Sequence, residues 1–437
     1  MNPENYESFG RYPKHYPANV IKLQWRKELP DIEKLSGNIL PFGCGKSYGD
    51  VCLNKEGTLI DTRGMNKLID FDPENKTITC EAGMTLSALL DFLVPRGFFL
   101  AVTPGTKHIT AGGAIANDVH GKNHHRMGTF GTQTLKFELI RSDGQSMICS
   151  KDENPDMFAA TIGGLGLTGL ITWAEFKVIK IPSPYIKMDS IKFDNLEEFF
   201  AINSEADKRF DYTVSWIDCT ASGSRIGRGI YTGGNFTDKD TKSQDLKESG
   251  SPPNFPFEYP FINNATVNLF NKVYFNKQIN KSETTITHYN PFFYPLDAVE
   301  GWNKAYGKEG FLQYQFLVPF GKEYDTVYLL LRKISESGLS SFLTVMKTFG
   351  NVSSPGMLSF PKPGVNLAID FRYEGRKTLD TLDLLDDIVR SADGSIYPAK
   401  DAHMSGEDFR RFYPNWNEFK KYKDPKFSSS FWRRVSE

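Results

Sequence analysis

The chain has 437 residues, of which 39% are hydrophobic, and its 52 Lys and Arg residues nearly balance 53 Asp and Glu residues to a net charge of -1. This length suffices for about two to three domains with buried cores, and the charge balance excludes a global attraction to nucleic acid or anionic lipid. The five cysteines show no CxxC spacing, which argues against a disulfide framework or zinc ribbon and favours a reducing, cytoplasmic compartment.

The N-terminal stretch MNPENYESFGRYPKHYP lacks the apolar core of a signal peptide. No apolar run reaches the roughly 18 residues that a membrane-spanning helix needs. We therefore expect a soluble cytoplasmic protein without a membrane span, whose contact with a membrane, if it makes one, is peripheral and at the inner face.

Residues 37 to 180 alternate short strands, glycine-rich turns and short helices. TLIDTRGMNKLIDFDPENKTITCEAG predicts two β-rich runs separated by a turn at residues 72–75. TLSALLDFLVPRG predicts a helix that Thr85 caps and Gly97 ends. FELIRSDGQSMIC predicts a hairpin, and NPDMFAATIGG predicts a short helix capped by Asn154.

After residue 182 the texture changes, and KIPSPY is typical of a linker. FLQYQFLVP and VNLAIDF predict longer strands, and LDTLDLLDDIVRSADG predicts a helix. The polar stretch over residues 233–256 predicts a mobile surface loop. Residues 396–437 are rich in aromatic and basic side chains, and the sequence shows no internal repeat.

Three glycine-containing loops could line an extended, doubly phosphorylated ligand. PFGCGKSYGD can present consecutive amides as an anion nest, with two hydroxyls beside them, and TPGTKHITAGGAIAND and GGLGLTG add to it. GLGLTG also matches the dinucleotide fingerprint, but a helix precedes it and a strand follows, so a Rossmann site is not expected there. Whether these glycines only pack tightly or face a flavin stays open.

The block HGKNHH carries His120, His124 and His125. Zinc needs about four convergent ligands, whereas Gly121 and Asn123 argue against a helix that would align two of the histidines. We therefore expect no metal here, and we expect His124 and His125 to hold the loop by hydrogen bonds.

The order GxGxSYGD, LID, EAG, PGTxxxTxGGAIAxDxHGKNHH and GGxGLTG resembles the FAD-binding PCMH-type module of the vanillyl-alcohol oxidase superfamily. The resemblance continues through FLQYQFLVP, FLTVMKTFG, SFPKPGVNLAIDF and YPAKD, and it is closest to the decaprenylphosphoryl-ribose 2-oxidase family. It implies an α+β fold with an FAD-binding domain over residues 1–182 and a mixed-sheet substrate domain over 183–395. A C-terminal segment, 396–437, would return to the FAD-binding domain.

The resemblance also implies site residues. Those expected to bind FAD are Gly43, Gly45, Lys46, Ser47, Tyr48, Gly49, Pro104, Gly105, Thr106, Thr110, Gly112, Gly113, Ala116, Asn117, His120, Gly121, Gly166, Gly169 and Tyr397. Those expected to bind substrate are Tyr294, Gln313, Gln315, Lys347, Phe349, Asn366 and Lys400. FAD is expected to be non-covalent, because covalent relatives use a histidine where this chain has Lys46.

We expect Lys400, His120 and Lys122 to be catalytic, with Tyr397 and Tyr413 helping to lower the pKa of Lys400. Blander interpretations stay open at this point. His120 could be an ordinary pocket histidine, Lys347 a surface lysine, the polar face of FLQYQFLVP solvent-exposed, and Lys400 paired with Asp401 at the surface.

The implied reaction is FAD-dependent oxidation of a secondary sugar hydroxyl, at C2 of a polyprenyl-phosphoryl pentose. A separate NAD(P)-dependent short-chain reductase would complete an epimerisation in cell-wall polysaccharide biosynthesis. An aldonolactone or alditol oxidase acting on a small free sugar stays open, as does a non-catalytic FAD-binding protein. One departure is Ala368, where mycobacterial members carry a cysteine; thiol chemistry beside the flavin is therefore excluded.

Overall fold

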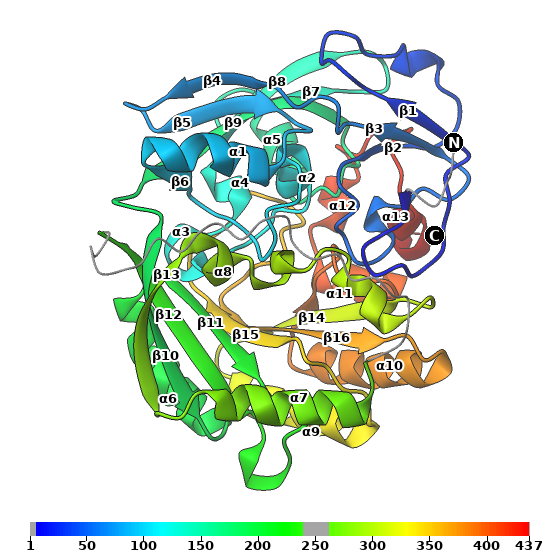
Figure 1. The fold of residues 1–437 in the computed structure, drawn as a ribbon. Coiled ribbons are helices and arrows are strands. Elements are labelled where there is room, and N and C mark those ends of the chain that lie inside the picture. Colours follow the sequence, from blue (N-terminus) through cyan, green and yellow to red (C-terminus); the bar gives the residue numbers. More distant parts are fainter. Residues whose placement is uncertain (1–5, 239–261, 437) are drawn as a thin grey trace.

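The computed structural model describes residues 6–238 and 262–436 (Figure 1). Its fold is α+β, as the sequence predicts, and it contains three sheets. The N-terminal half holds a parallel three-stranded sheet of order β1-β3-β2 and an antiparallel sheet of order β4-β5-β9-β7-β8, in which β6 also pairs with β9.

The strands of this half are β1 (Asn19–Lys22), β2 (Ile39–Phe42), β3 (Thr58–Asp61), β4 (Leu68–Asp72), β5 (Thr77–Glu81), β6 (Phe98–Leu100), β7 (Thr134–Ile140), β8 (Ser146–Ser150) and β9 (Leu170–Lys180). Its helices are α1 (Leu86–Leu93), α2 (Ala111–Ala116), α3 (His124–Met127), α4 (Phe130–Gln133) and α5 (Pro155–Thr161), with a 3-10 turn η3 (Asp50–Cys52).

Local signals in this half place most elements correctly. Asp72 accepts the amides of Glu74 and Asn75 in the predicted β4–β5 turn. Thr85 caps α1 by accepting the amide of Ala88 at 3.2 Å. Asn154 precedes α5 as predicted, but the expected side-chain cap is wrong: its backbone is left-handed and its amide donates to the carbonyl of Ile148 instead.

The second half of the chain forms an eight-stranded sheet of order β13-β10-β12-β11-β15-β16-β14-β17. Its strands are β10 (Tyr185–Phe193), β11 (Tyr212–Ile217), β12 (Gly229–Thr237), β13 (Ser282–His288), β14 (Phe311–Pro319), β15 (Thr344–Phe349), β16 (Gly364–Arg372) and β17 (Ser395–Ile396). Its helices are α6 (Leu196–Arg209), α7 (Asn264–Lys277), α8 (Tyr289–Phe293), α9 (Glu323–Ser337) and α10 (Arg376–Ser391).

This sheet consists of two βαββαβ units that the sequence did not reveal as a repeat. The first is β10-α6-β11-β12-α7-β13 and the second is β14-α9-β15-β16-α10-β17, and they join edge to edge where β11 pairs with β15. All strand pairs in this sheet are antiparallel, so the expected mixed sheet is wrong for this half. Parallel pairs occur in the separate β1-β3-β2 sheet.

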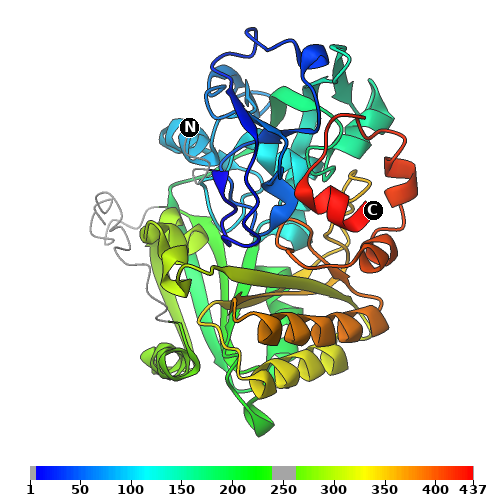
Figure 2. The ribbon, with the colours of Figure 1, turned by 90° about the vertical axis from the view of Figure 1, so that its right-hand side faces the viewer.

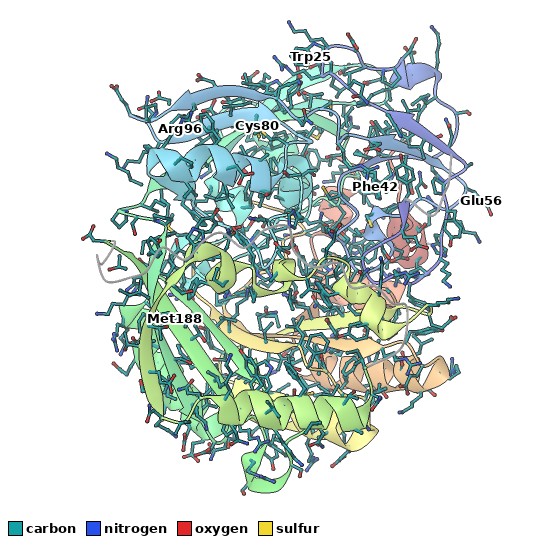
Figure 3. All side chains as sticks on the ribbon, in the orientation of Figure 1. Trp25, Phe42, Glu56, Cys80, Arg96 and Met188 are labelled. Carbon is teal, nitrogen blue, oxygen red and sulfur yellow. The ribbon has the colours of Figure 1, made fainter. Side chains whose placement is uncertain are left out.

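The two faces of the sheet have different neighbours. α6, α9 and α10 pack on one face, and Figure 2 shows α9 and α10 side by side beneath the strands, with the FAD-binding half above them. Figure 3 shows side chains filling the space between these layers, with Met188 on β10. The face without these three helices is thus turned toward the N-terminal half.

The predicted loop over 233–256 is wrong at its start, because Gly233 and Gly234 pair with β10 and β11 inside strand β12. Glycine fits these two strand positions because the rings of Phe210 and Phe292 pack directly over Gly233 and Gly234, in the space that a larger side chain would occupy. Residues 239–256 of the predicted loop lie outside the described residues.

The C-terminal segment contains α11 (Gly406–Phe412), α12 (Trp416–Phe419) and α13 (Ser430–Ser436). It returns to the first half, where the amide of Ile39 donates to Lys426 and the amide of Ser428 donates to Ile39. These bonds join the C-terminal segment to β2, and the division of the chain at residues 182 and 395 stays a prediction. No helix in the described ranges is long and apolar enough to cross a bilayer.

Arg434 on α13 ties the ends of the chain together. Its guanidinium binds Asp50 at 2.7 and 2.9 Å and Asp401 at 2.8 Å, and both carboxylates are buried. We expect Arg434→Met to lower the free energy of unfolding by about 3–5 kcal/mol, because two buried carboxylates lose their partner. Urea unfolding followed by circular dichroism measures this; removal of the exposed Arg376–Asp380 pair by Arg376→Met is the control and should change little. Equal effects of the two variants would contradict the assignment.

Candidate active site

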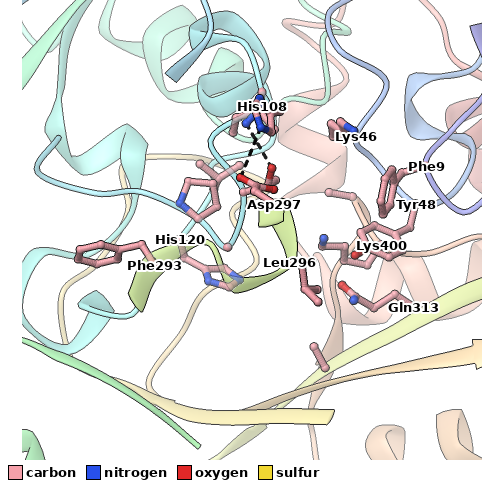
Figure 4. A pocket seen from close by; sticks show the side chains of 18 of the residues that line it. Phe9, Lys46, Tyr48, His108, His120, Phe293, Leu296, Asp297, Gln313 and Lys400 are labelled. Carbon is pink, nitrogen blue, oxygen red and sulfur yellow. Dashed lines mark hydrogen bonds and ion pairs between the residues drawn. The ribbon is translucent and has the colours of Figure 1, made fainter. Parts of the chain in front are cut away.

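A cavity of about 1070 Å³ lies between the glycine loops and the uncovered sheet face (Figure 4). This exceeds the upper end of the range of about 300–1,000 Å³ for a single small ligand, so it has room for a cofactor and a substrate together. The predicted site residues that line it are Gly43, Gly45, Lys46, Ser47, Tyr48, Pro104, Gly105, Thr106, Thr110, Gly112, Gly113, Ala116, Asn117, His120, Gly121, Lys122, Gly166, Gly169, Gln313, Gln315, Lys347, Asn366, Tyr397 and Lys400.

Three predicted residues do not line the cavity. A Cβ on Gly49 would lie 1.7 Å from the carbonyl oxygen of Asp401, so this glycine serves a close backbone approach. Tyr294 is buried with its hydroxyl 2.6 Å from that of Thr103. Phe349 lies beneath His120, with ring centres 4.8 Å apart, and supports the site from behind.

The strands β14 and β16 deliver polar side chains to the cavity by simple alternation. On β14 the even positions from Leu312 to Val318 join the helix-covered core, whereas Gln313 and Gln315 face the cavity. On β16 the residues Asn366 and Ala368 face the same way. Both glutamines are buried, so the interpretation of a solvent-exposed polar strand face is wrong.

The glycine loops fit an FAD molecule. Gly45 and Gly166 have φ of +59° and +74°, which non-glycine residues adopt only with strain, and this lets the backbone approach a ligand. The side-chain oxygen of Asn117 is buried in the cavity wall without a hydrogen-bond partner among the described residues, while its amide donates to Gly113. An unsatisfied buried acceptor of this kind is costly unless a ligand donates to it. As the sequence predicts, the GLGLTG loop joins helix α5 to strand β9, the reverse of a Rossmann order.

His120 is the centre of the polar end. Its Nε2 lies 2.8 Å from the amide nitrogen of Gln315, and its Nδ1 lies 3.0 Å from Nζ of Lys347, which also donates to the carbonyl of Gly121. Burial and the nearby Lys347 hold the pKa of His120 well below its usual value, so the ring is neutral. A neutral imidazole has one N–H, so either Lys347 is the free amine that accepts it or Gln315 presents its carbonyl oxygen instead.

Three lysines share this end of the cavity. Burial lowers the pKa of Lys347 to about 7, assisted by Lys122 and Lys400, and burial alone lowers that of Lys122 to about 7. Lys122 donates to the carbonyl of Phe292. The interpretation of Lys347 as a surface lysine is therefore wrong, because Lys347 lies inside the cavity against His120.

Lys400 points into the cavity with its Nζ 3.9 Å from the centre of the Tyr48 ring (Figure 4). Burial lowers its pKa to about 8, although the carboxylate of Asp370 opposes the shift. Asp401 binds Arg434, so the alternative of a surface Lys400–Asp401 pair is wrong. The aromatic ring beside the Lys400 amine is that of Tyr48, rather than Tyr397 or Tyr413 as expected. The hydroxyls of Tyr397 and Tyr413 donate to the carbonyls of Asn117 and Ile396.

Asp370 is a polar residue of the site that the sequence did not single out. It accepts the amide of Gln313 at 2.6 Å and the hydroxyl of Tyr306 at 3.4 Å. Burial raises its pKa to about 7, against the effects of Gln313 and Lys400. The sequence could have indicated it, because Asp370 follows Asn366 and Ala368 at intervals of two on strand β16 and therefore lies on the same face of the sheet.

The other two histidines have different roles. His125 bonds the carbonyl of Phe210 at 2.9 Å, as expected. The expected hydrogen bond of His124 is wrong: its ring nitrogens have no partner in the described part of the chain, and the ring packs on Phe349. Among residues 6–238 and 262–436, the group of side chains that could hold a metal lies elsewhere, at Asp383, Asp386 and His403. There the imidazole of His403 already pairs with both carboxylates.

Away from His120 the cavity wall gains large apolar side chains. Along β15 and its neighbour β11 these are Val345, Leu343, Trp216 and, against Trp216, Tyr274, with the polar Ser190, Thr232 and Gln278 in the same wall. The cavity reaches the surface at Tyr274 and Val299, which are 39% and 36% exposed. The cavity therefore runs from a polar, buried end beside the glycine loops to an apolar end open to solvent.

The fold and this site define an FAD-binding protein, and comparison with known proteins agrees. Residues 24–150 match the FAD binding domain family. The chain is 31% identical to decaprenylphosphoryl-β-D-ribose oxidase of Mycolicibacterium smegmatis over 91% of this chain and 89% of that protein. It is 28% identical to an uncharacterised protein in the mprA 5' region of Streptomyces coelicolor, over 80% of this chain and all of that protein. It is also 29% identical to L-gulonolactone oxidase of Mus musculus, over 38% of this chain and 37% of that enzyme.

The protein is thus an FAD-dependent oxidoreductase. More specifically, the chain belongs to the decaprenylphosphoryl-β-D-ribose oxidase family, as its motifs predict.

We expect the FAD to be held without a covalent bond. Lys46 stands where covalent relatives anchor the flavin through a histidine, and its Nζ lies over the ring of Phe9 at 4.6 Å. Acid precipitation of the purified holoprotein should therefore give a colourless pellet and a yellow supernatant. A pellet that stays yellow after washing in denaturant would contradict this prediction.

Proposed function

We propose that the protein oxidises a secondary hydroxyl of a sugar, at C2 of a polyprenyl-phosphoryl pentose. A separate NAD(P)-dependent short-chain reductase would then reduce the keto product and complete an epimerisation. The family membership supports this substrate class, because the relative from Mycolicibacterium smegmatis is named for a decaprenylphosphoryl ribose.

The observation that carries the proposal is the division of the cavity into two ends. His120, Lys347 and Lys400 surround the buried end, where a sugar can form hydrogen bonds. Trp216 and Val299 belong to the apolar end, which opens to the surface and suits a hydrocarbon chain. A small free sugar needs a closed polar pocket and gains nothing from an apolar opening.

The residues of the polar end can orient the sugar and take its hydroxyl proton. Bound FAD supplies the hydride acceptor for the C–H bond. Lys400, with a pKa of about 8, is partly a free amine at neutral pH and can accept the proton. The neutral ring of His120 can bind a sugar hydroxyl, and protonated Lys347 or Lys122 can stabilise negative charge that develops in the cavity.

Two alternatives follow from other features. An aldonolactone or alditol oxidase is suggested by the partial similarity to L-gulonolactone oxidase, which covers 38% of this chain. A non-catalytic FAD-binding protein would need no base, whereas this cavity contains three lysines whose pKa values are lowered into the working range of catalysis.

Anaerobic mixing of the holoenzyme with candidate sugars tests the reaction and the substrate class together. We expect a polyprenyl-phosphoryl pentose to bleach the flavin absorbance, and a free pentose or aldonolactone to bleach it far more slowly at equal concentration. Faster bleaching by the free sugar would favour the alditol or lactone oxidase. Flavin that no sugar or lactone bleaches would favour the non-catalytic alternative.

Replacement of the proposed base gives a second prediction. Lys400→Met keeps the volume of the buried side chain but removes the amine, so flavin reduction should slow by about 10²–10⁴-fold while FAD content stays unchanged. Because the free amine is the active form, the wild-type rate should rise with pH through an apparent pKa of about 8, and this limb should disappear in the variant. Stopped-flow absorbance over pH 6 to 10 measures both effects.

Lys362→Met is the control, because Lys362 also has its Nζ over an aromatic ring, that of Tyr413, but is an exposed residue and does not line the cavity. It should retain both the rate and the pH profile. A Lys400→Met enzyme with the wild-type rate would end the assignment and leave His120 as the base.

A further inference from the structure

The helix α7 exposes an apolar face. Leu269 and Val273 are 66% and 61% exposed, and Phe270 and Tyr274 beside them are also exposed. Ile279, just after the helix, is 88% exposed. We call these five residues the α7 patch. A helix of a soluble protein ordinarily turns such side chains toward the core, whereas α7 buries Val267, Asn271 and Phe275 on its opposite side.

The charge around the patch selects the kind of partner. From Asn263 to Lys281 the sequence contains three lysines and no Asp or Glu. Lys281 binds Glu198, but Lys272 and Lys277 form no ion pair within the described residues, and both are exposed. Free cations beside exposed large apolar side chains are the pattern of a helix that lies in the interface of an anionic bilayer.

The patch is continuous with the opening of the cavity. Tyr274 belongs to both, and its ring centre lies 4.7 Å from that of Trp216 inside the cavity. Lys277 also lines the opening, where its ammonium can meet a lipid phosphate. The acidic residues that line the cavity, Glu283, Asp297 and Glu300, all lie outside α7, which carries Lys272 and Lys277. Figure 1 shows α7 on the same side of the molecule as α8.

We propose that the α7 patch is the surface by which the protein binds an anionic phospholipid membrane. With α7 lying at the headgroup level, the apolar end of the cavity opens onto the bilayer. A lipid-linked sugar can then place its head group at His120 while its chain remains among the lipids. This last role rests on the proposed function; binding to the membrane itself does not.

Co-sedimentation of the holoenzyme with phosphatidylglycerol vesicles and with phosphatidylcholine vesicles tests the proposal. We expect the wild type to bind the anionic vesicles more tightly, and salt to weaken the binding. The double variant Leu269→Ser/Val273→Ser should bind at least about tenfold more weakly, because it removes two exposed apolar side chains that would enter the interface. Neither residue lines the cavity, so FAD content and the bleaching of flavin by a water-soluble substrate should be unchanged.

Phe320→Ser is the control, because Phe320 is equally apolar and half exposed but lies outside the patch, and it should keep wild-type binding. Absence of binding by the wild type to either vesicle would overturn the proposal, as would a double variant that binds like the wild type. A dimer that Leu269→Ser/Val273→Ser dissociates in sedimentation velocity, without vesicle binding, would assign the patch to a second copy of the chain. Ile279→Ser, outside the helix, gives an independent variant if the double variant is unstable. Failure of substrate bleaching with intact vesicle binding would contradict the proposed function alone.

Discussion

The two-sidedness of the eight-stranded sheet is the constraint on which the site depends. α6, α9 and α10 cover one face, and the side chains of a strand alternate between its faces. The uncovered face must therefore be closed by the FAD-binding half, and whatever it carries lies against the glycine loops. Gln313, Gln315 and Asn366 are polar side chains that line the cavity, whereas the alternate residues of the same strands are apolar and meet the helix layer.

The electrostatics of the polar end follow from this enclosure. Burial lowers the pKa values of Lys122, Lys347 and Lys400 toward neutrality, and the other two lysines add to the shift at Lys347. Asp370 moves in the opposite direction, to about 7. The charge of such a site depends on the bound ligand. An anionic ligand favours protonated lysines, whereas the lysines without such a ligand favour the free amine. Binding of an anionic ligand is thereby coupled to the protonation of the groups that line the cavity.

Local features of the fold could be predicted from the sequence because they depend on local physics. The turn at Asp72, the cap at Thr85 and the glycine loops each require particular residues within a few positions. The pairing of the two βαββαβ units could not be predicted, because β11 and β15 are distant in sequence and meet only in three dimensions. The same holds for Arg434, whose partners Asp50 and Asp401 come from opposite ends of the chain.

The repeated architecture of the sheet also explains how one cavity can have two chemically different ends. Each βαββαβ unit contributes a cavity face, and the second unit places Gln315 and Lys347 beside His120 of the N-terminal half. The first unit instead contributes many apolar or small side chains, such as Met188 and Trp216, and it includes α7. Since the units meet along a single strand pair, residues on one can change without disturbing the hydrogen bonds of the other. The residues that line the polar end and those that line the apolar entrance can therefore differ independently, because the two ends are built on separate βαββαβ units.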